Sequence, residues 1–178
     1  MDRDQGGALT LRLLTGQPAE MAALQRVLEA APEYFLTVTG LPPGNAEAQS
    51  TYTALPPEKT YEDKFVWGLY AGASMIGCAD VIRGYPVREK AVIGLLLLAE
   101  AWQHRGLGRP FATLIEQAIH AWPEIERLRL GVVASNTTAL TFWRKLGYRE
   151  TGEVKSPPPG MVAEVHVFEK PLQRGPVS

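Results

Sequence analysis

Residues 91–122 constrain the fold of this chain more than any other stretch. They begin with AVIGLLLL at residues 91–98, which is apolar on both faces and predicts a strand buried on both sides. A loop with two glycines and two arginines follows, and apolar residues then recur at helical spacing from Phe111 to Trp122. The stretch therefore predicts a central β-strand that leads through a positively charged loop into an amphipathic helix.

The remaining segments predict a mixed sheet with helices on both faces. Apolar patterns predict strands over residues 9–13, 64–70, 75–83, 91–98, 127–134, 148–155 and 161–170. Helical spacing predicts helices over residues 19–30, 46–53, 111–122 and 135–147. The proline-rich segment 32–57 has little other periodicity and is expected to form a long functional loop. The order of hairpins and helical crossovers indicates an α/β (α+β) fold with about seven strands.

Length and charge limit the possible partners. The 178 residues suit a single domain over 1–178, with residues 1–7 and 173–178 expected to fray. A net charge of −1 gives no general attraction to nucleic acid, and no apolar run approaches the roughly 18 residues of a membrane span. The first residues, MDRDQGG, lack the apolar segment of a signal peptide, and Cys78 is alone. We therefore expect a cytoplasmic protein with no nucleic-acid or membrane partner.

The loop before the amphipathic helix is suited to an anion. The first N–H groups of a helix have no partner within it, and its N-terminus carries roughly half a positive charge. Gly106 and Gly108 allow a ligand to approach the backbone closely, and Arg105 and Arg109 add positive charge. These features predict a site for a pyrophosphate. The spacing matches neither a P-loop nor a dinucleotide-binding G-x-G-x-x-G motif.

Two motifs together resemble one family. QHRGLG at residues 103–108 resembles the Q/R-x-x-G-x-G/A loop of the GNAT superfamily of acyl-CoA-dependent N-acyltransferases. About thirty residues further on, SNTTALTFWRKLGYRETGE resembles the family segment in which an asparagine opens a helix that ends in an aromatic run. The matching residues are Asn136, Phe142, Trp143, Leu146, Gly147 and Tyr148. The resemblance implies the GNAT fold, in which the sheet is splayed at its centre.

The resemblance also implies acetyl-CoA as the cofactor, with no metal ion. The residues implied to bind it are Leu96, Leu97, Leu98, Gln103, His104, Arg105, Gly106, Leu107, Gly108, Arg109, Asn136 and Trp143. In the family the pyrophosphate lies on the loop amides and the pantetheine arm runs beside the central strand. The acyl group enters the gap beside the next strand. For Asn136, contact with the cofactor region and capping of the helix are both open.

The catalytic residues are less clear from the sequence. In many family members a tyrosine at the position of Trp143 acts as the general acid. The indole N–H of Trp143 does not titrate and so cannot take that role. Asp80 and His166 are the candidates for the general base, and a water chain to solvent is an alternative. Tyr34 and Phe35, in the proline-rich segment, either form one wall of the acceptor pocket or cover the core.

These features predict an N-acetyltransferase that moves an acetyl group from acetyl-CoA to a primary amine by direct attack in a ternary complex. The acceptor is expected to be a small molecule or a peptide, and a homodimer is possible because family members often pair. The alternative is a CoA-binding domain of the same fold with weak or no catalysis, in a regulatory or sensor role. A pure interaction module would not need the glycine–arginine loop.

Overall fold

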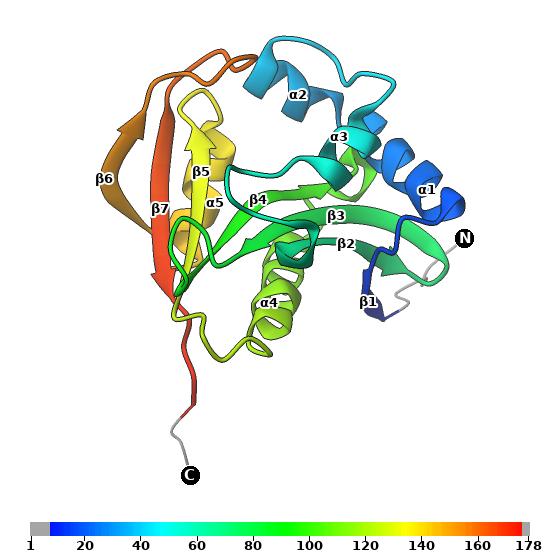
Figure 1. Ribbon diagram of the computed structural model, residues 1–178. Coiled ribbons are helices and arrows are strands. Elements are labelled where there is room, and N and C mark those ends of the chain that lie inside the picture. The colour runs from blue at the N-terminus through cyan, green and yellow to red at the C-terminus, as the bar shows by residue number, and fades with distance from the viewer. Residues whose placement is uncertain (1–7, 176–178) are drawn as a thin grey trace.

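Seven strands form one mixed sheet in the computed structural model, which describes residues 8–175 (Figure 1). The strands are β1 (Leu9–Leu13), β2 (Lys64–Ala71), β3 (Ser74–Arg83), β4 (Lys90–Leu98), β5 (Arg127–Val133), β6 (Arg149–Lys155) and β7 (Val165–Pro171). Their order is β1-β2-β3-β4-β5-β7-β6, and β4 and β5 are the parallel pair. The predicted mixed sheet is confirmed.

Helices cover both faces of this sheet. They are α1 (Pro18–Glu29), α2 (Pro32–Thr39), α3 (Glu47–Thr53), α4 (Gly108–Ile119) and α5 (Thr137–Lys145). Side chains alternate along a strand, so the neighbours Cys78 and Ala79 of β3 point to opposite faces. Cys78 packs in a cluster with α1 and Ala79 in one with α4, which places α1–α3 on one face and α4–α5 on the other.

Helix α2 was not predicted, because the proline-rich segment was expected to be a long loop. Pro32 lies in the first turn, where a missing N–H costs no hydrogen bond. Gly40 ends the helix in the left-handed conformation, with φ of 73°. An eight-residue helix is too short to give a clear periodic pattern, although it buries Phe35 and Val38 three residues apart.

The sheet is splayed between its two central strands. β4 and β5 pair at Lys90–Arg127, Ala91–Leu128 and Val92–Arg129, and beyond these residues they separate. Just beyond the last pair, β4 contains a bulge, because Asp80 of β3 pairs with Leu95 while Val81 pairs with Ile93. The rest of β4 therefore has no strand partner on the side that faces β5.

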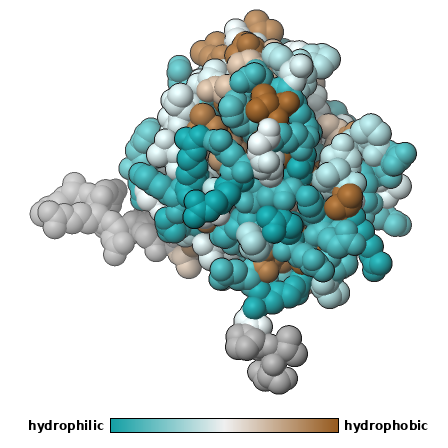
Figure 2. All heavy atoms as spheres, turned by 90° about the vertical axis from the view of Figure 1, so that its left-hand side faces the viewer, coloured by the Kyte–Doolittle hydropathy of each residue, from teal (hydrophilic) through white to brown (hydrophobic). Residues whose placement is uncertain are grey.

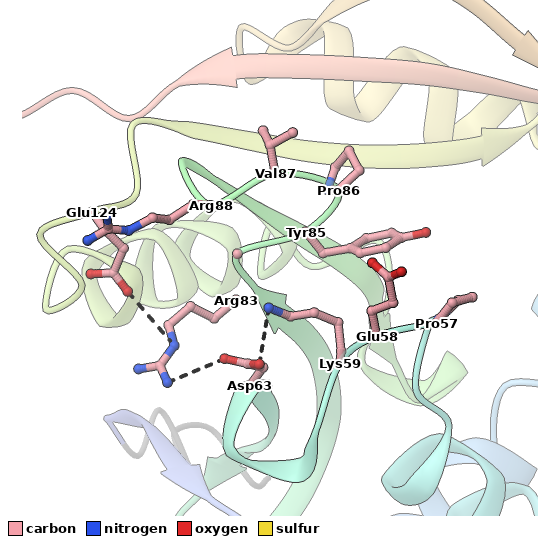
Figure 3. A pocket seen from close by; sticks show the side chains of 11 residues that line it. Pro57, Glu58, Lys59, Asp63, Arg83, Tyr85, Pro86, Val87, Arg88 and Glu124 are labelled. Carbon is pink, nitrogen blue, oxygen red and sulfur yellow. Dashed lines mark hydrogen bonds and ion pairs between the residues drawn. The ribbon is translucent and has the colours of Figure 1, made fainter.

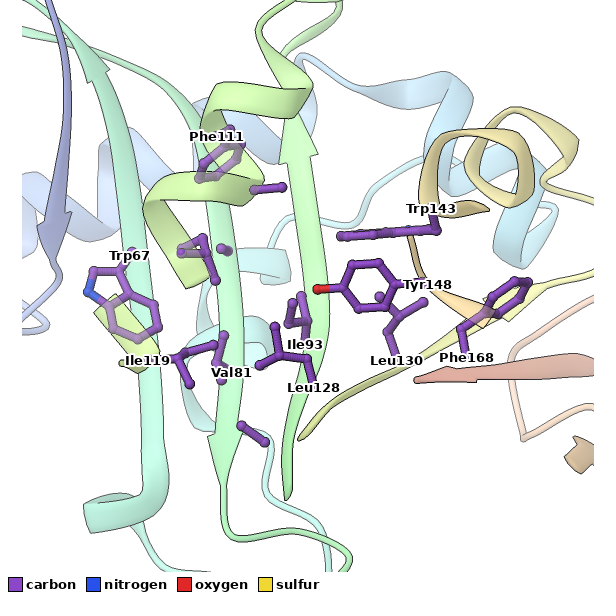
Figure 4. Packing of buried hydrophobic residues seen from close by; sticks show 14 of the residues in the cluster. Trp67, Val81, Ile93, Phe111, Ile119, Leu128, Leu130, Trp143, Tyr148 and Phe168 are labelled. Atoms are coloured by element: carbon purple, nitrogen blue, oxygen red, sulfur yellow. The ribbon is translucent and has the colours of Figure 1, made fainter. Parts of the chain in front are cut away.

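The main core lies between the sheet and helices α4 and α5. Figure 4 shows the ring of Trp143 lying over that of Tyr148, which points toward Ile93. The two ring centroids are 4.9 Å apart at 73°, and the buried Tyr148 hydroxyl donates to Glu116 Oε1 at 3.2 Å. Such aromatic pairs contribute about 0.5–1.5 kcal/mol beyond the area they bury. Tyr148 is thus a core residue.

The edge of the sheet formed by β6 is fully exposed. Figure 2 shows that the face on this side is mainly hydrophilic, as the charged sequence RETGEVK requires. Charges on an edge strand oppose pairing with another chain. No helix within residues 8–175 is long and apolar enough to cross a membrane.

The ends of the chain were expected to fray over residues 1–7 and 173–178. Residues 1–7 and 176–178 lie outside the described part of the chain. Within 173–175, Arg174 donates hydrogen bonds to the carbonyl oxygens of His120, Trp122 and Ile125.

Candidate active site

A cavity of about 1000 Å³ lies where β4 and β5 separate. It is lined by the end of β4, the loop before α4, the first turns of α4, helix α5 and helix α2. The predicted cofactor-binding residues that line it are Leu96, Leu97, Leu98, Gln103, His104, Gly106, Leu107, Gly108, Arg109, Asn136 and Trp143. Motifs about thirty residues apart in sequence therefore meet around one space.

The loop before α4 presents backbone amides to this cavity. Gln103 Nε2 donates to the Leu98 carbonyl at 2.8 Å and so ties the loop to the end of β4. His104 and Gly106 have φ of 58° and 75°, a left-handed conformation that turns the chain sharply into the helix. Leu107 provides no side-chain cap, so the N–H groups of the first turn have no partner within the helix. This is the geometry of an anion site.

Two positively charged side chains, those of Arg109 and Lys145, lie at the same end of the cavity. His104, Arg109 and Lys145 line it, and Arg109 Nη2 donates to the Lys145 carbonyl at 3.4 Å. Lys145 was missed from the sequence, although basic residues in the last turn of a helix are a recognisable signal. Arg105 does not line the cavity, and its guanidinium lies 5.1 Å from the ring centroid of Trp102.

Gly108 lies where α4 approaches α5. A Cβ on this residue would be 2.8 Å from Cε2 of Phe142, a ring that also lines the cavity. Gly106, by contrast, has no atom within 4 Å of the equivalent position. The glycine at 108 is thus required for packing between the two helices, and the one at 106 for its backbone conformation.

Asn136 caps α5. Its side chain accepts a hydrogen bond from the Ala139 N–H at 3.1 Å, so the capping role is confirmed. The residue also lines the cavity, and its contact with the cofactor stays a prediction.

Trp143 forms part of the cavity wall and of the core. It is 7% exposed and lies edge to face with Phe142 and Tyr148, both at centroid distances of 4.9 Å. We expect Trp143→Phe to weaken acetyl-CoA binding by about 1 kcal/mol, because the smaller ring loses part of this aromatic contact. The pH profile of kcat should not change, since an indole does not titrate. Titration calorimetry measures the affinity for acetyl-CoA, and initial rates across pH give the profile of kcat. A shift of the acidic side of that profile would place Trp143 in the path of proton transfer.

Asp80 lies beside the bulge of β4. Its Oδ1 is 2.7 Å from Nζ of the buried Lys64, an ion pair without a well-aligned hydrogen bond. A Cβ on Gly94 would lie 3.1 Å from its Oδ2, so the missing side chain leaves room for this carboxylate. Burial raises the pKa of Asp80 above its usual value, and Lys64 opposes this effect. Asp80 does not line the large cavity but lies at the start of the splay.

His166 lies on the other face of the sheet. Its neighbour Val165 packs with Val38 of α2, so the histidine side chain points to the side of α4 and α5. Its Nε2 is 3.1 Å from Glu164 Oε1, and it does not line the cavity. The structure therefore separates the two candidate bases.

Tyr34 and Phe35 also have different surroundings. Tyr34 lines the cavity, whereas Phe35 is buried in the cluster beneath α1 and does not. The two rings lie edge to face, with centroids 5.2 Å apart. Tyr34 therefore has the position expected of a residue in the pocket wall, whereas Phe35 has the position expected of a residue that covers the hydrophobic core.

Another cavity, of about 590 Å³, lies at the far end of the β3–β4 hairpin (Figure 3). Four of its charged side chains pair with one another: Lys59 and Arg83 contact Asp63 at 3.0 and 3.5 Å, and Arg83 contacts Glu124 at 3.9 Å. It contains none of the predicted site residues. The large cavity is therefore the candidate active site.

Comparison with known proteins identifies the family of the chain. The family model described as the acetyltransferase (GNAT) family matches residues 22–148. An acetyltransferase from Thermus thermophilus is 28% identical, with a TM-score of 0.70, covering 91% of this chain and 97% of that one.

Two neighbours of lower identity were solved with a ligand and share the fold. A GNAT acetyltransferase from Elizabethkingia anophelis with acetyl-CoA bound is 15% identical, with a TM-score of 0.63 over 92% of this chain and 97% of that one. An aminoglycoside acetyltransferase in complex with coenzyme A is 20% identical, with a TM-score of 0.70 over 92% and 95%. The search of curated proteins found no match. The family match and the splayed sheet agree, and the chain belongs to the GNAT family of acetyltransferases.

Proposed function

We propose that this protein transfers an acetyl group from acetyl-CoA to a primary amine by direct attack of the amine on the thioester. The observation that carries the proposal is the cavity at the splay, which combines a helix N-terminus with an unpaired strand edge. GNAT neighbours with acetyl-CoA or CoA bound support the choice of donor.

The residues around the cavity fit such a donor. The amides of Gly106–Arg109, with His104 and Lys145 nearby, suit the pyrophosphate. The backbone of Leu96–Leu98 lacks a strand partner toward β5 and can pair with the amide groups of a pantetheine arm. Acetyl-CoA supplies the thioester, and its acyl end then lies toward the start of the splay.

The acceptor approaches from the face covered by α2. Gly94 of β4 and Gly131 of β5 are exposed although they belong to the central strands. Their missing side chains open the same face, because a Cβ on Gly94 would meet Asp80 and one on Gly131 would meet Val165. Asp80 is the general base of the proposal, since it removes a proton from the incoming ammonium group and leaves a nucleophilic amine.

The second candidate function is CoA binding without turnover, in a regulatory or sensor role. Trp143 favours this sensor role. Many family members have a tyrosine that acts as general acid at this position, whereas the indole of Trp143 cannot provide a proton.

A turnover assay separates the two functions. The purified protein is mixed with acetyl-CoA and a panel of amines, and the released thiol is detected. The panel contains an aminoglycoside, a polyamine and a peptide with a free N-terminus, which represent acceptors named for structural neighbours. We expect thiol release that depends on one class of amine. Binding without release from any amine would favour the sensor role.

Thermal unfolding tests donor binding independently of the acceptor. Acetyl-CoA at about 100 times its Kd adds roughly 2.7 kcal/mol to the free energy of unfolding. For a chain of this length that corresponds to a rise in Tm of about 5–10 °C. Acetate serves as the control ligand. If acetyl-CoA leaves Tm unchanged at millimolar concentration, the assignment of the cavity is wrong.

A further inference from the structure

Tyr34 lines the cavity and carries a hydroxyl that the proposed function does not yet use. Tyr34 packs against both smaller clusters on the α1–α3 face of the sheet. One cluster contains Cys78 and Leu97 of the β3–β4 half, and the other contains Val133 and Val165 of the β5–β7 half. Tyr34 thus lies on this face of the splayed sheet and forms part of the wall of the cavity.

Hydrogen bonds hold α2, and with it this ring, against the end of β4. The backbone N–H of Glu33 donates to Glu100 Oε1 at 2.9 Å, and the N–H of Glu100 donates to the Ala30 carbonyl at 2.8 Å. Glu100 directly follows the strand and its neighbour Ala99. The position of Tyr34 is thus fixed by the strand that carries the proposed thioester site.

The Tyr34 hydroxyl makes no hydrogen bond to any residue within 8–175. Burial raises the pKa of Tyr34 to about 12, and the neighbouring Cys78 and Glu47 contribute in the same direction. The group is therefore a neutral donor and acceptor throughout the working pH range of an enzyme.

Tyr34 of α2 and Asp80 of β3 lie on the same face of the sheet. Cys78, in the cluster with Tyr34, pairs with Leu97, and Asp80 pairs with Leu95. Residues two apart on a strand share a face and are separated by roughly 7 Å. The two polar side chains thus lie on the same face of the sheet, the one from which the acceptor is proposed to enter.

We infer that Tyr34 relays a proton from the attacking nitrogen to the departing sulfur of CoA. As the N–C bond forms and the C–S bond breaks, the hydroxyl gives its proton to sulfur, and its oxygen takes the proton that nitrogen loses. The products are an amide and a free thiol, and Tyr34 ends neutral. The inference rests on the proposed function and adds a residue to it.

A concerted relay agrees with the surroundings of the hydroxyl. A phenol whose pKa is raised does not ionise readily, so a mechanism that leaves a phenolate behind is unfavourable here. In a relay the oxygen receives one proton as it releases another, and no charge accumulates on it. The relay also supplies the proton that Trp143 cannot give.

Tyr34→Phe tests the relay, with Tyr52→Phe as the matched control. Tyr52 lies on α3 in the same cluster but outside the cavity. We expect Tyr34→Phe to lower kcat by about 100-fold, as removal of a proton-transfer group does. The KM of acetyl-CoA and its effect on Tm should not change. The solvent deuterium isotope effect on kcat should fall in Tyr34→Phe and stay unchanged in Tyr52→Phe.

Each other outcome overturns the relay. Unchanged kcat in Tyr34→Phe, with an active wild type, removes Tyr34 from the mechanism and leaves the proposed function intact. A loss of the Tm response to acetyl-CoA in Tyr34→Phe assigns the residue to donor packing instead. Wild-type protein that binds acetyl-CoA but acetylates no amine in the panel overturns the relay together with the proposed function.

Discussion

Asp80→Asn should lower kcat by roughly 100- to 10,000-fold, the range for loss of a general base. The introduced amide is nearly the same size as the carboxylate and keeps an oxygen near Lys64, but it does not accept a proton from the acceptor. The binding of acetyl-CoA should be retained, since Asp80 does not line the donor cavity. Single-turnover kinetics with saturating acetyl-CoA measure the loss directly.

The pH dependence gives a further test of Asp80. A base must be ionised to act, and burial raises the pKa of this carboxyl above its usual value of 3.8. The kcat/KM of the wild type should therefore be constant at high pH and fall as pH decreases through that raised pKa. The decrease in kcat/KM that is due to protonation of Asp80 should be absent from the pH profile of the Asp80→Asn variant. Protonation of the amine, by contrast, should affect the wild type and the variant alike.

Two variants separate the loss of a base from a loss of folding. Asp63→Asn removes a carboxylate that pairs with Lys59 at 3.0 Å, far from the splay, and should leave kcat unchanged. The side chain of Lys64 is only 4% exposed, so an imperfect partner for it could cost about 3–5 kcal/mol. The double variant with Lys64→Met removes that charge. Wild-type kcat in Asp80→Asn, or in the double variant, would contradict the assignment.

The cofactor side of the site could be predicted from the sequence because its signals are local. The strand at 91–98, the loop after it and helix α4 are consecutive, and the apolar spacing of α4 is regular. The cap at Asn136 follows from one residue type at the start of a helix. Local hydrogen bonding and helix geometry fix these features, so the tertiary fold does not change them.

The acceptor side depends on contacts between distant segments and could not be predicted. Whether Tyr34 or Phe35 faces the cavity depends on the rotation of α2, which packing against both halves of the sheet decides. Asp80 and His166 both lie on strands, and the register of those strands directs the two side chains to opposite faces of the sheet. The bulge at Gly94 is a property of pairing with β3 that no local pattern indicates.

Gly108→Val should weaken acetyl-CoA binding by at least about 100-fold, or about 2.8 kcal/mol. Two effects combine in this variant. A side chain in the first turn of α4 fills space where an anion would approach the amides. It also forces movement of Phe142, because even a Cβ would lie 2.8 Å from Cε2 of that ring. Titration calorimetry and the loss of the Tm response to acetyl-CoA measure the change.

A second substitution distinguishes these two causes. Gly108→Val combined with Phe142→Ala removes the clash between α4 and α5 but keeps the side chain in front of the amides. Affinity should stay low in this double variant, relative to Phe142→Ala alone, if the first turn of α4 holds the pyrophosphate. Thr113→Val places the same residue on an exposed position of α4 and should bind as the wild type does. Full recovery of affinity in the double variant would mean that the loop does not bind phosphate and that Gly108 serves only helix packing.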